Sequence, residues 1–135
     1  MTAVLVAAAR LTGTVPGVVA VGLAGSWARG TARPDSDVDL VALTDRPERL
    51  LGTHDWFAAF GPGAELVRSA DFGAIQERRL RLPDGLVVEV GVGSPSWAAT
   101  DPLDAGTARV VRDGFVALAD PAGLLAALVA AVRSS

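Results

Sequence analysis

The feature that most constrains the fold is a pair of short apolar runs that enclose a polar loop. The first run, VVAVGLA, covers residues 18–24, and the second is the apolar end of DVDLVAL at residues 37–43. Strands of a half-exposed sheet alternate apolar and polar residues, whereas a continuous, valine-rich run is typical of a strand buried on both faces. Such strands need packed layers on each side, so we expect a sheet with helices against it.

The remaining segments supply further strands and the helices. Helices are expected at residues 2–11, as one turn at residues 27–30, from Pro47 to about Phe60, and after Asp120, which should cap a final helix with Pro121 in its first turn. Strands are expected at residues 65–69, 75–82 and 86–92, the last two joined by a Pro83-Asp84-Gly85 turn, while residues 110–118 suggest a strand interrupted at Gly114. This order predicts an α+β fold, a mixed β-sheet with helices packed on it, in a single domain covering residues 1–135.

Composition narrows the chemistry that the chain can perform. There is no cysteine and His54 is the only histidine, which excludes disulfides and thiolate nucleophiles and nearly excludes cysteine or histidine metal sites. Aspartate, glutamate and serine remain as candidates. The net charge of −3 and the pI near 5.0 argue against sequence-independent binding to long nucleic acid, which needs a basic surface.

The chain is apolar for a small soluble protein, with 50% hydrophobic residues and a mean hydropathy of +0.39. A core of this size has limited room for that much apolar surface, which suggests an interface in a homodimer or with a partner. The opening MTAVLVAAAR lacks a basic region and its apolar run is short. It predicts a helix rather than a signal peptide or membrane span, so we expect a cytoplasmic protein with no membrane partner.

The polar loop holds the densest group of chemically useful residues, GSWARGTARPDSDVDL, at residues 25–40. Asp37 and Asp39 are two apart on a strand, so their carboxylates point to the same face and favour a cation such as Mg²⁺. Gly25 lets the backbone approach a ligand closely, and Ser26 offers a hydroxyl near the start of a helical turn, a combination that suits a phosphate. Each half alone is also typical of a plain turn or a solvated strand end.

The spacing of these residues is more specific than either half. Gly25-Ser26, ten residues, and then Asp37-x-Asp39 resemble the signature of the nucleotidyltransferase superfamily related to DNA polymerase beta. The longer run GSWARGTARPDSDVDLVAL is similar to the bacterial branch with minimal and aminoglycoside-type nucleotidyltransferases. The resemblance implies the nucleotidyltransferase fold and an enzyme that transfers a nucleoside monophosphate to a hydroxyl acceptor.

The resemblance also implies a third acidic residue on a later strand. Glu89 is the preferred candidate because it lies within GLVVEVGV, on the face opposite Val88, Val90 and Val92, where a lone glutamate needs a partner. Glu77 on the preceding strand is the competing candidate, although its sequence surroundings suggest an exposed charge. Many members carry aspartate at the third position, so the longer glutamate leaves its role open.

The metal set implied by the resemblance is Asp37, Asp39 and Glu89. These residues would hold Mg²⁺, with two ions expected, which would bridge the phosphates of a nucleoside triphosphate and stabilise charge during in-line displacement at the α-phosphate. ATP is the expected donor. Glu89 could bind the metal, act as the base toward the acceptor hydroxyl, or do both.

The phosphate set implied by the resemblance is Gly25 and Ser26, which would hold the β- and γ-phosphates. Arg29 follows Ser26 by one turn and could add a bidentate contact to a phosphate oxygen. The alternative for Arg29 is a surface ion pair with Asp35.

The acceptor stays open at this point. Polymerase-type members usually carry additional nucleic-acid-binding domains that these 135 residues do not supply, so no long nucleic acid is expected. The implied acceptor is a small hydroxylated molecule held at a dimer interface or a separate helical protein, because some minimal members act as antitoxins that adenylylate a toxin subunit.

A catalytically inactive module that binds a nucleotide or a partner is the alternative function. The basic stretch at Arg78, Arg79 and Arg81 is treated as a solvated hairpin face, with a patch for an acceptor or partner as its alternative.

Overall fold

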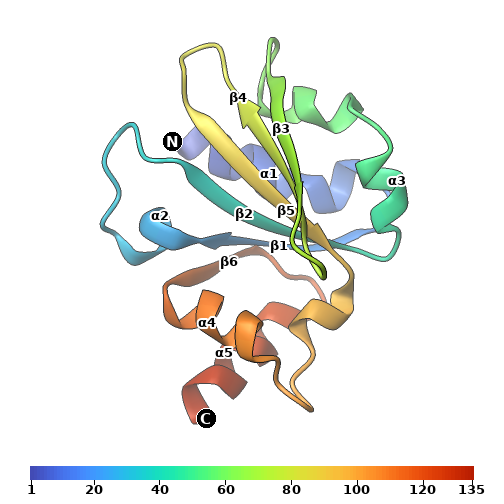
Figure 1. Ribbon diagram of the computed structural model, residues 1–135, viewed down its shortest axis with the longest axis vertical. Coiled ribbons are helices and arrows are strands. Elements are labelled where there is room, and N and C mark those ends of the chain that lie inside the picture. Colours follow the sequence, from blue (N-terminus) through green and yellow to red (C-terminus); the bar gives the residue numbers. More distant parts are fainter.

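A six-stranded mixed sheet forms the centre of the computed structural model, which describes residues 1–135 (Figure 1). In chain order the elements are α1 (Thr2–Thr14), β1 (Val18–Ala24), α2 (Gly25–Arg29), β2 (Val38–Thr44), α3 (Pro47–Leu51), η1 (Asp55–Phe60), β3 (Glu65–Asp71), β4 (Gln76–Arg81), β5 (Val87–Gly93), η2 (Pro95–Ala98), α4 (Ala105–Arg112), β6 (Phe115–Ala119) and α5 (Leu124–Ser134). The strand order is β3-β4-β5-β2-β1-β6, with β2 and β5 parallel and all other neighbours antiparallel. The predicted α+β fold with a mixed sheet is confirmed.

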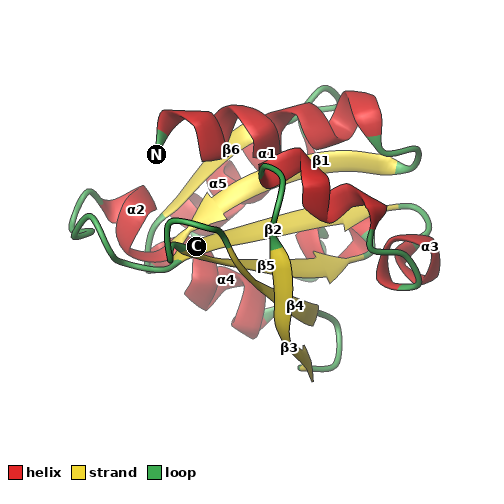
Figure 2. Cartoon of the chain, turned by 90° about the horizontal axis from the view of Figure 1, so that it is seen from above, coloured by secondary structure: helices red, strands yellow, loops and turns green.

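Helices cover the sheet from both sides, so the central strands are buried on both faces as the apolar runs predict. The helix α1 lies over one face, while α4 and α5 lie against the other (Figure 2). The first face buries the strand residues Val21, Leu23, Val38, Leu40, Val88, Val90 and Val92 beneath α1, α3 and η1. The second face has its own core around Leu43, Leu125 and Leu128. None of the helices is both long enough and apolar enough to span a bilayer.

The second face is covered over only part of its length. Along β2, Leu43 is completely buried and Val41 is 8% exposed, whereas Asp39, next on the same face, is half-buried. The cover by η2, α4 and α5 therefore ends before the first residues of β2. Because β2 and β5 run parallel, both strands begin at this uncovered end, and polar side chains are tolerated there.

The helix expected from Pro47 to about Phe60 is wrong, because α3 ends at Leu51 and a separate 3₁₀ helix follows. The indole Nε1 of Trp56 donates to the carbonyl oxygens of Leu50, at 2.8 Å, and Thr53, at 3.1 Å. These bonds satisfy carbonyls at the end of α3 and turn the chain back on itself.

The C-terminal segment also differs from the prediction. A strand is expected at residues 110–118. The helix α4 instead continues to Arg112, and the strand β6 begins at Phe115, after Gly114. The Asp104 carboxylate caps this helix by accepting from the Thr107 backbone N–H at 2.9 Å. Asp120 does cap α5, accepting from two backbone N–H groups at 2.9 and 3.0 Å, but Pro121 lies in the turn before that helix rather than in its first turn.

Candidate active site

The two halves of the loop motif lie against each other. Asp39 pairs with Ala24 in the β1–β2 ladder, which places Gly25 next to the Asp39 side chain. A Cβ atom at Gly25 would lie 2.5 Å from Asp39 Oδ2, and the φ of +72° at Gly25 belongs to the left-handed region that favours glycine. Gly25 is therefore needed both for the backbone turn and to leave room for the carboxylate.

Glu89 lies directly beside Asp39, as its partner across the parallel β2–β5 pair. Residues paired across neighbouring strands direct their side chains to the same face, so the two carboxyl groups are neighbours there. Burial, reinforced by the negative charges of Asp37 and Glu77, raises the pKa of Asp39. Burial, followed by the contact with Asp39, raises the pKa of Glu89 to about 7. The uncovered end of the sheet thus concentrates negative charge that a cation would relieve.

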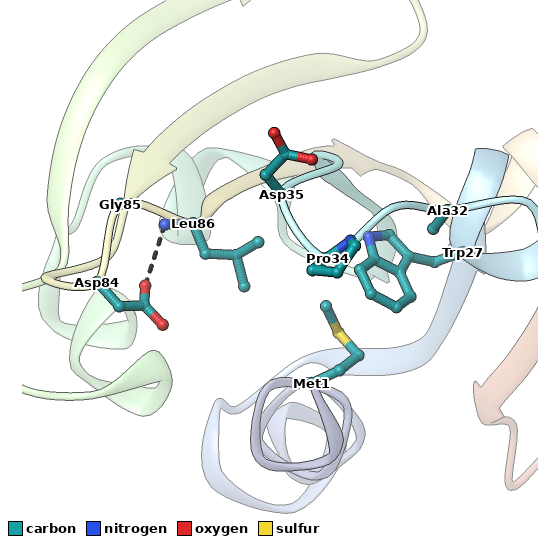
Figure 3. Close-up of a pocket in the computed structure, with 8 residues that line it drawn as sticks. All are labelled: Met1, Trp27, Ala32, Pro34, Asp35, Asp84, Gly85 and Leu86. Carbon is teal, nitrogen blue, oxygen red and sulfur yellow. Dashed lines mark hydrogen bonds between the residues drawn. The ribbon is translucent and has the colours of Figure 1, made fainter.

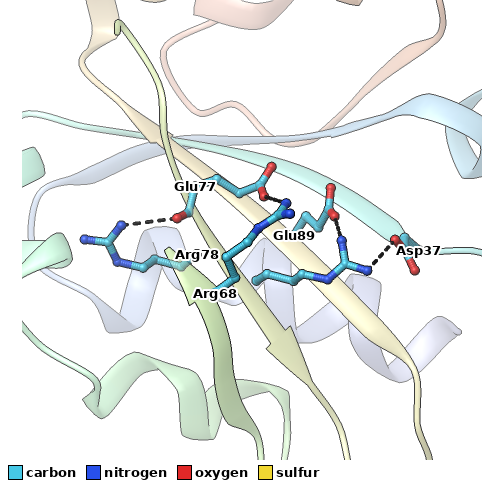
Figure 4. Close-up of polar contacts among 6 residues, drawn as sticks. Asp37, Arg68, Glu77, Arg78 and Glu89 are labelled. Carbon is cyan, nitrogen blue, oxygen red and sulfur yellow. Dashed lines mark hydrogen bonds and ion pairs between the residues drawn. The ribbon is translucent and has the colours of Figure 1, made fainter. Parts of the chain in front are cut away.

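Asp37 is connected to Glu89 through an arginine. The Arg79 guanidinium donates through Nη2 to Asp37 Oδ2 at 3.2 Å and through Nη1 to Glu89 Oε1 (Figure 4). Arg79 is the ladder partner of Glu89 across the β4–β5 pair. As the side chains stand, no three carboxylates converge closely enough to hold one metal ion.

Arg79 corrects one sequence expectation. Its side chain is 27% exposed and lies between two acids, so the expected solvated hairpin face is wrong for this residue. The signal was present in the sequence: counting outward from Asp84, the middle of the Pro-Asp-Gly turn, pairs Arg79 with Glu89.

Glu77 belongs to the same polar face, two residues before Arg79 on β4. Its side chain is only 15% exposed and accepts from Arg68 Nη2 at 3.0 Å (Figure 4), so the expected exposed charge is wrong as well. Its negative charge helps to raise the pKa of both Asp39 and Glu89. Glu77 is therefore a fourth acid of the group rather than a simple substitute for Glu89.

A cleft of about 890 Å³ is lined by Asp39, Glu77 and Glu89, but not by Asp37, and lies between the sheet, α2, the β3–β4 loop and α4. Residues that line it from these different elements include Gly25, Ser26, Asp39, Glu89, Phe72 and Arg109. The cleft is large enough for a nucleotide-sized ligand, and its lining combines acidic, basic and aromatic side chains.

Arg29 also lines the cleft, but its hydrogen bond goes to the C-terminal segment. Its Nη1 donates to the Asp113 carbonyl oxygen at 2.8 Å, so Asp113 rather than Asp35 is its partner. The Gly25 N–H donates to the Gly114 carbonyl oxygen at 3.2 Å. These bonds fasten α2 to the turn after α4. A phosphate contact by Ser26 or Arg29 stays a prediction.

A second hollow, of about 620 Å³, lies between Trp27 and Leu86 (Figure 3). The Trp27 Nε1 donates to the Ser36 carbonyl oxygen at 3.0 Å, which fixes the loop after α2. Asp35 and Asp84 are the acids there, and the Asp84 carboxylate already accepts from the Leu86 N–H at 3.0 Å. This hollow therefore lacks the facing acids found in the cleft.

The chain was compared with solved structures, curated proteins and protein families. Solved structures similar to the chain include a Cid1 poly(U) polymerase, at 17% identity and a TM-score of 0.45, and a cytoplasmic RNA terminal U-transferase, at 20% identity and a TM-score of 0.43. These matches cover 67% of this chain, which spans only 28% and 27% of the respective proteins. No curated protein matches the chain.

A family model described as a nucleotidyltransferase domain matches residues 9–92, well over half of the chain. The matched segment runs from α1 to β5 and contains the glycine turn, the two aspartates and Glu89. The chain belongs to the nucleotidyltransferase domain family.

Proposed function

We propose that the protein transfers a nucleoside monophosphate, AMP from ATP, to a hydroxyl group of an acceptor. The observation that carries this proposal is the contact between Gly25, Asp39 and Glu89 at the floor of a nucleotide-sized cleft. Three separate segments bring these residues together, and the family match includes all of them. A plain turn beside a solvated strand end would not need a residue without a side chain next to the Asp39 carboxylate.

The chemistry of the acidic residues suits a divalent metal ion, although their side chains do not converge on one point as they stand. Carboxylate oxygens are the ligands that Mg²⁺ prefers, and burial, with neighbouring acids as a further cause, raises the pKa values of Asp39 and Glu89. The Arg79 guanidinium already lies between Asp37 and Glu89 as a cation. We assign Asp37, Asp39 and Glu89 to hold Mg²⁺, two ions being expected, which when bound would supply charge stabilisation for the reacting phosphate.

The chain's own residues would bind and orient the donor. Gly25 presents backbone without a side chain at the cleft, and the Ser26 hydroxyl lies on the same lining, where both would contact the β- and γ-phosphates. Arg29 would add positive charge from a position fixed by its bond to Asp113. Glu89 would bind metal, receive the proton of the acceptor hydroxyl, or do both.

The acceptor is proposed to be a small hydroxylated molecule or a separate helical protein, with a homodimer as one way to complete the site. The acidic net charge of −3 supports an acceptor other than a long nucleic acid. A cytoplasmic setting suits a reaction that uses ATP.

A second candidate is a catalytically inactive module of the same fold that binds a nucleotide or a partner. One observation favours it: Arg79 ties Asp37 to Glu89, and no three carboxylates converge on one point. The two candidates differ in whether bound nucleotide is turned over.

The test is an incubation of the chain with α-³²P-labelled ATP, CTP, GTP or UTP, Mg²⁺ and candidate acceptors, beside the double variant Asp37→Asn/Asp39→Asn. Transfer of label that needs Mg²⁺ and is lost in the double variant supports the enzyme. Binding of nucleotide without transfer supports the second candidate. The absence of both Mg²⁺-dependent binding and transfer in the wild type would overturn the proposal.

A further inference from the structure

The polar face of the sheet contains more acids than cations in direct contact with them. Arg79 pairs with Asp37 and Glu89, and Arg68 pairs with Glu77, while Asp39 has no ion pair. The Asp37, Glu77 and Glu89 carboxylates are thus neutralised from β3 and β4, the hairpin that borders the cleft. Arg79 is the residue that contacts two members of the proposed metal set.

Two features hold Arg79 in this position. Its backbone pairs with that of Glu89 in the β4–β5 ladder, which directs both side chains to the same face. Its planar guanidinium offers two N–H groups in a fixed fork, one to each carboxylate, a geometry that a lysine ammonium would not reproduce. The contact is partly shielded from water, with Arg79 27% and Glu89 19% exposed.

We propose that Arg79 is a built-in counter-ion of the site, which competes with divalent metal for the Asp37 and Glu89 oxygens. This inference rests on the proposed function, because it takes those acids as metal ligands. The guanidinium already contacts Asp37 Oδ2 and Glu89 Oε1, so a metal ion held by the same two carboxylates would lie close to it, and two cations at one pair of carboxylates repel each other. Metal binding therefore requires Arg79 to withdraw.

The competition has a consequence for the order of binding. A displaced guanidinium needs another anion, and a nucleoside triphosphate brings several negative charges to the same cleft. Metal should therefore bind weakly alone and more tightly with nucleotide, through a coupling that depends on Arg79. Arg79 is in this sense a positioning residue: it lowers the affinity of the acids for metal until the nucleotide is bound.

The test measures Mn²⁺ binding, by electron paramagnetic resonance of the free ion, to wild type, Arg79→Gln and Arg81→Gln. Arg81 is the matched control because it lies on the same face of the same strand, is 52% exposed, and approaches only Glu65, at 3.9 Å. Without nucleotide, Arg79→Gln is expected to bind Mn²⁺ about tenfold more tightly than wild type. Arg81→Gln removes the same charge and is expected to stay close to wild type.

Two additions separate competition from a general effect of the substitution. Arg79→Lys keeps the charge without the fork and should show an intermediate Mn²⁺ affinity, even if the glutamine variant folds poorly. Adding α,β-methylene ATP should tighten Mn²⁺ binding in wild type more than in Arg79→Gln. A purely structural arginine would change thermal stability without these shifts in metal affinity.

The outcomes distinguish this inference from the proposed function. If Arg79→Gln and Arg79→Lys bind Mn²⁺ no better than Arg81→Gln, the proposed competition by Arg79 is refuted, while the assignment of the metal site is unaffected. If no variant binds Mn²⁺ with or without α,β-methylene ATP, the metal assignment fails and the counter-ion falls with it.

Discussion

The two faces of the sheet use the same strands for different purposes. On the first face β2 and β5 present Leu40, Val88 and Val90, which are buried beneath α1 and its neighbours. On the second face the adjacent residues Asp39 and Glu89 are acids at the floor of a cleft. Because side chains alternate along a strand, neighbouring residues lie on opposite faces: one contributes to the stability of the core and the next to the proposed chemistry. A substitution at one position should therefore affect one property and leave the other largely unchanged.

The sharpest test of this separation is Asp39→Asn. The substitution removes an acid of the proposed metal set, and we expect the rate of nucleotidyl transfer to fall about a thousandfold. This corresponds to the several kcal/mol by which a bound metal ion stabilises charge in the transition state. Stability should be unchanged or higher, because burial disfavours the charged form of this carboxyl group. Transfer assays and urea denaturation measure the two effects. A variant with nearly normal transfer would contradict the role given to Asp39.

The reverse test is Leu40→Ala, on the neighbouring residue. Leu40 is 2% exposed in the first core, so the cavity should lower the free energy of unfolding by about 3 kcal/mol. Nucleotide affinity of the folded fraction should change little, because the cleft lies on the opposite face. Urea denaturation gives the first value, and calorimetric titration with ATP and Mg²⁺ below the unfolding transition gives the second. A loss of affinity without a loss of stability would show that the faces are not separate.

Gly25→Ala tests the contact between the two halves of the motif. The new Cβ would be placed 2.5 Å from Asp39 Oδ2, so the carboxylate must move and transfer should fall about tenfold or more. Gly30→Ala is the matched control: its φ is +77°, but no atom lies within 4 Å of the Cβ position. Both variants should lose about 1 kcal/mol of stability from the left-handed backbone, and only Gly25→Ala should lose activity. Equal activities would mean that the close approach to Asp39 has no functional role.

The candidate site could be predicted from the sequence where it depends on local spacing. Asp37 and Asp39 are two residues apart on a strand, so their side chains lie on one face. In β5 the alternating valines face the first core, so Glu89 is directed away from it. Glu77 is expected to be an exposed charge and Arg79 part of a solvated hairpin face, and both expectations are wrong because they do not use the register of the hairpin. Without the hairpin register, QERRLR resembles any charged surface strand, and only pairing with β5 brings its glutamate and arginine to the acids.

The fold shows the same limit. The buried central strands and the mixed sheet follow from apolar runs, but the break after α3 does not. It depends on Trp56 bonding back to Leu50 and Thr53, a tertiary contact that overrides the helical pattern. The expected strand at residues 110–118 overlaps the end of α4, because Val110 and Val111 favour β structure, although Asp104 is a local signal for a helix.

The smallest expected effect separates the covered and uncovered parts of the second face. Asp104 caps α4, which borders the cleft, and Asp120 caps α5, which packs on the buried end near Leu43. Removing either cap by Asp104→Ala or Asp120→Ala should lower the free energy of unfolding by about 1 kcal/mol, measured by urea denaturation. Asp104→Ala should also weaken ATP binding, though less than Gly25→Ala does, because fraying of α4 loosens the wall that carries Arg109. If Asp120→Ala weakens ATP binding as much, then the helical cover of the second face acts as one unit, and the cleft is no more sensitive to α4 than to the core beside it.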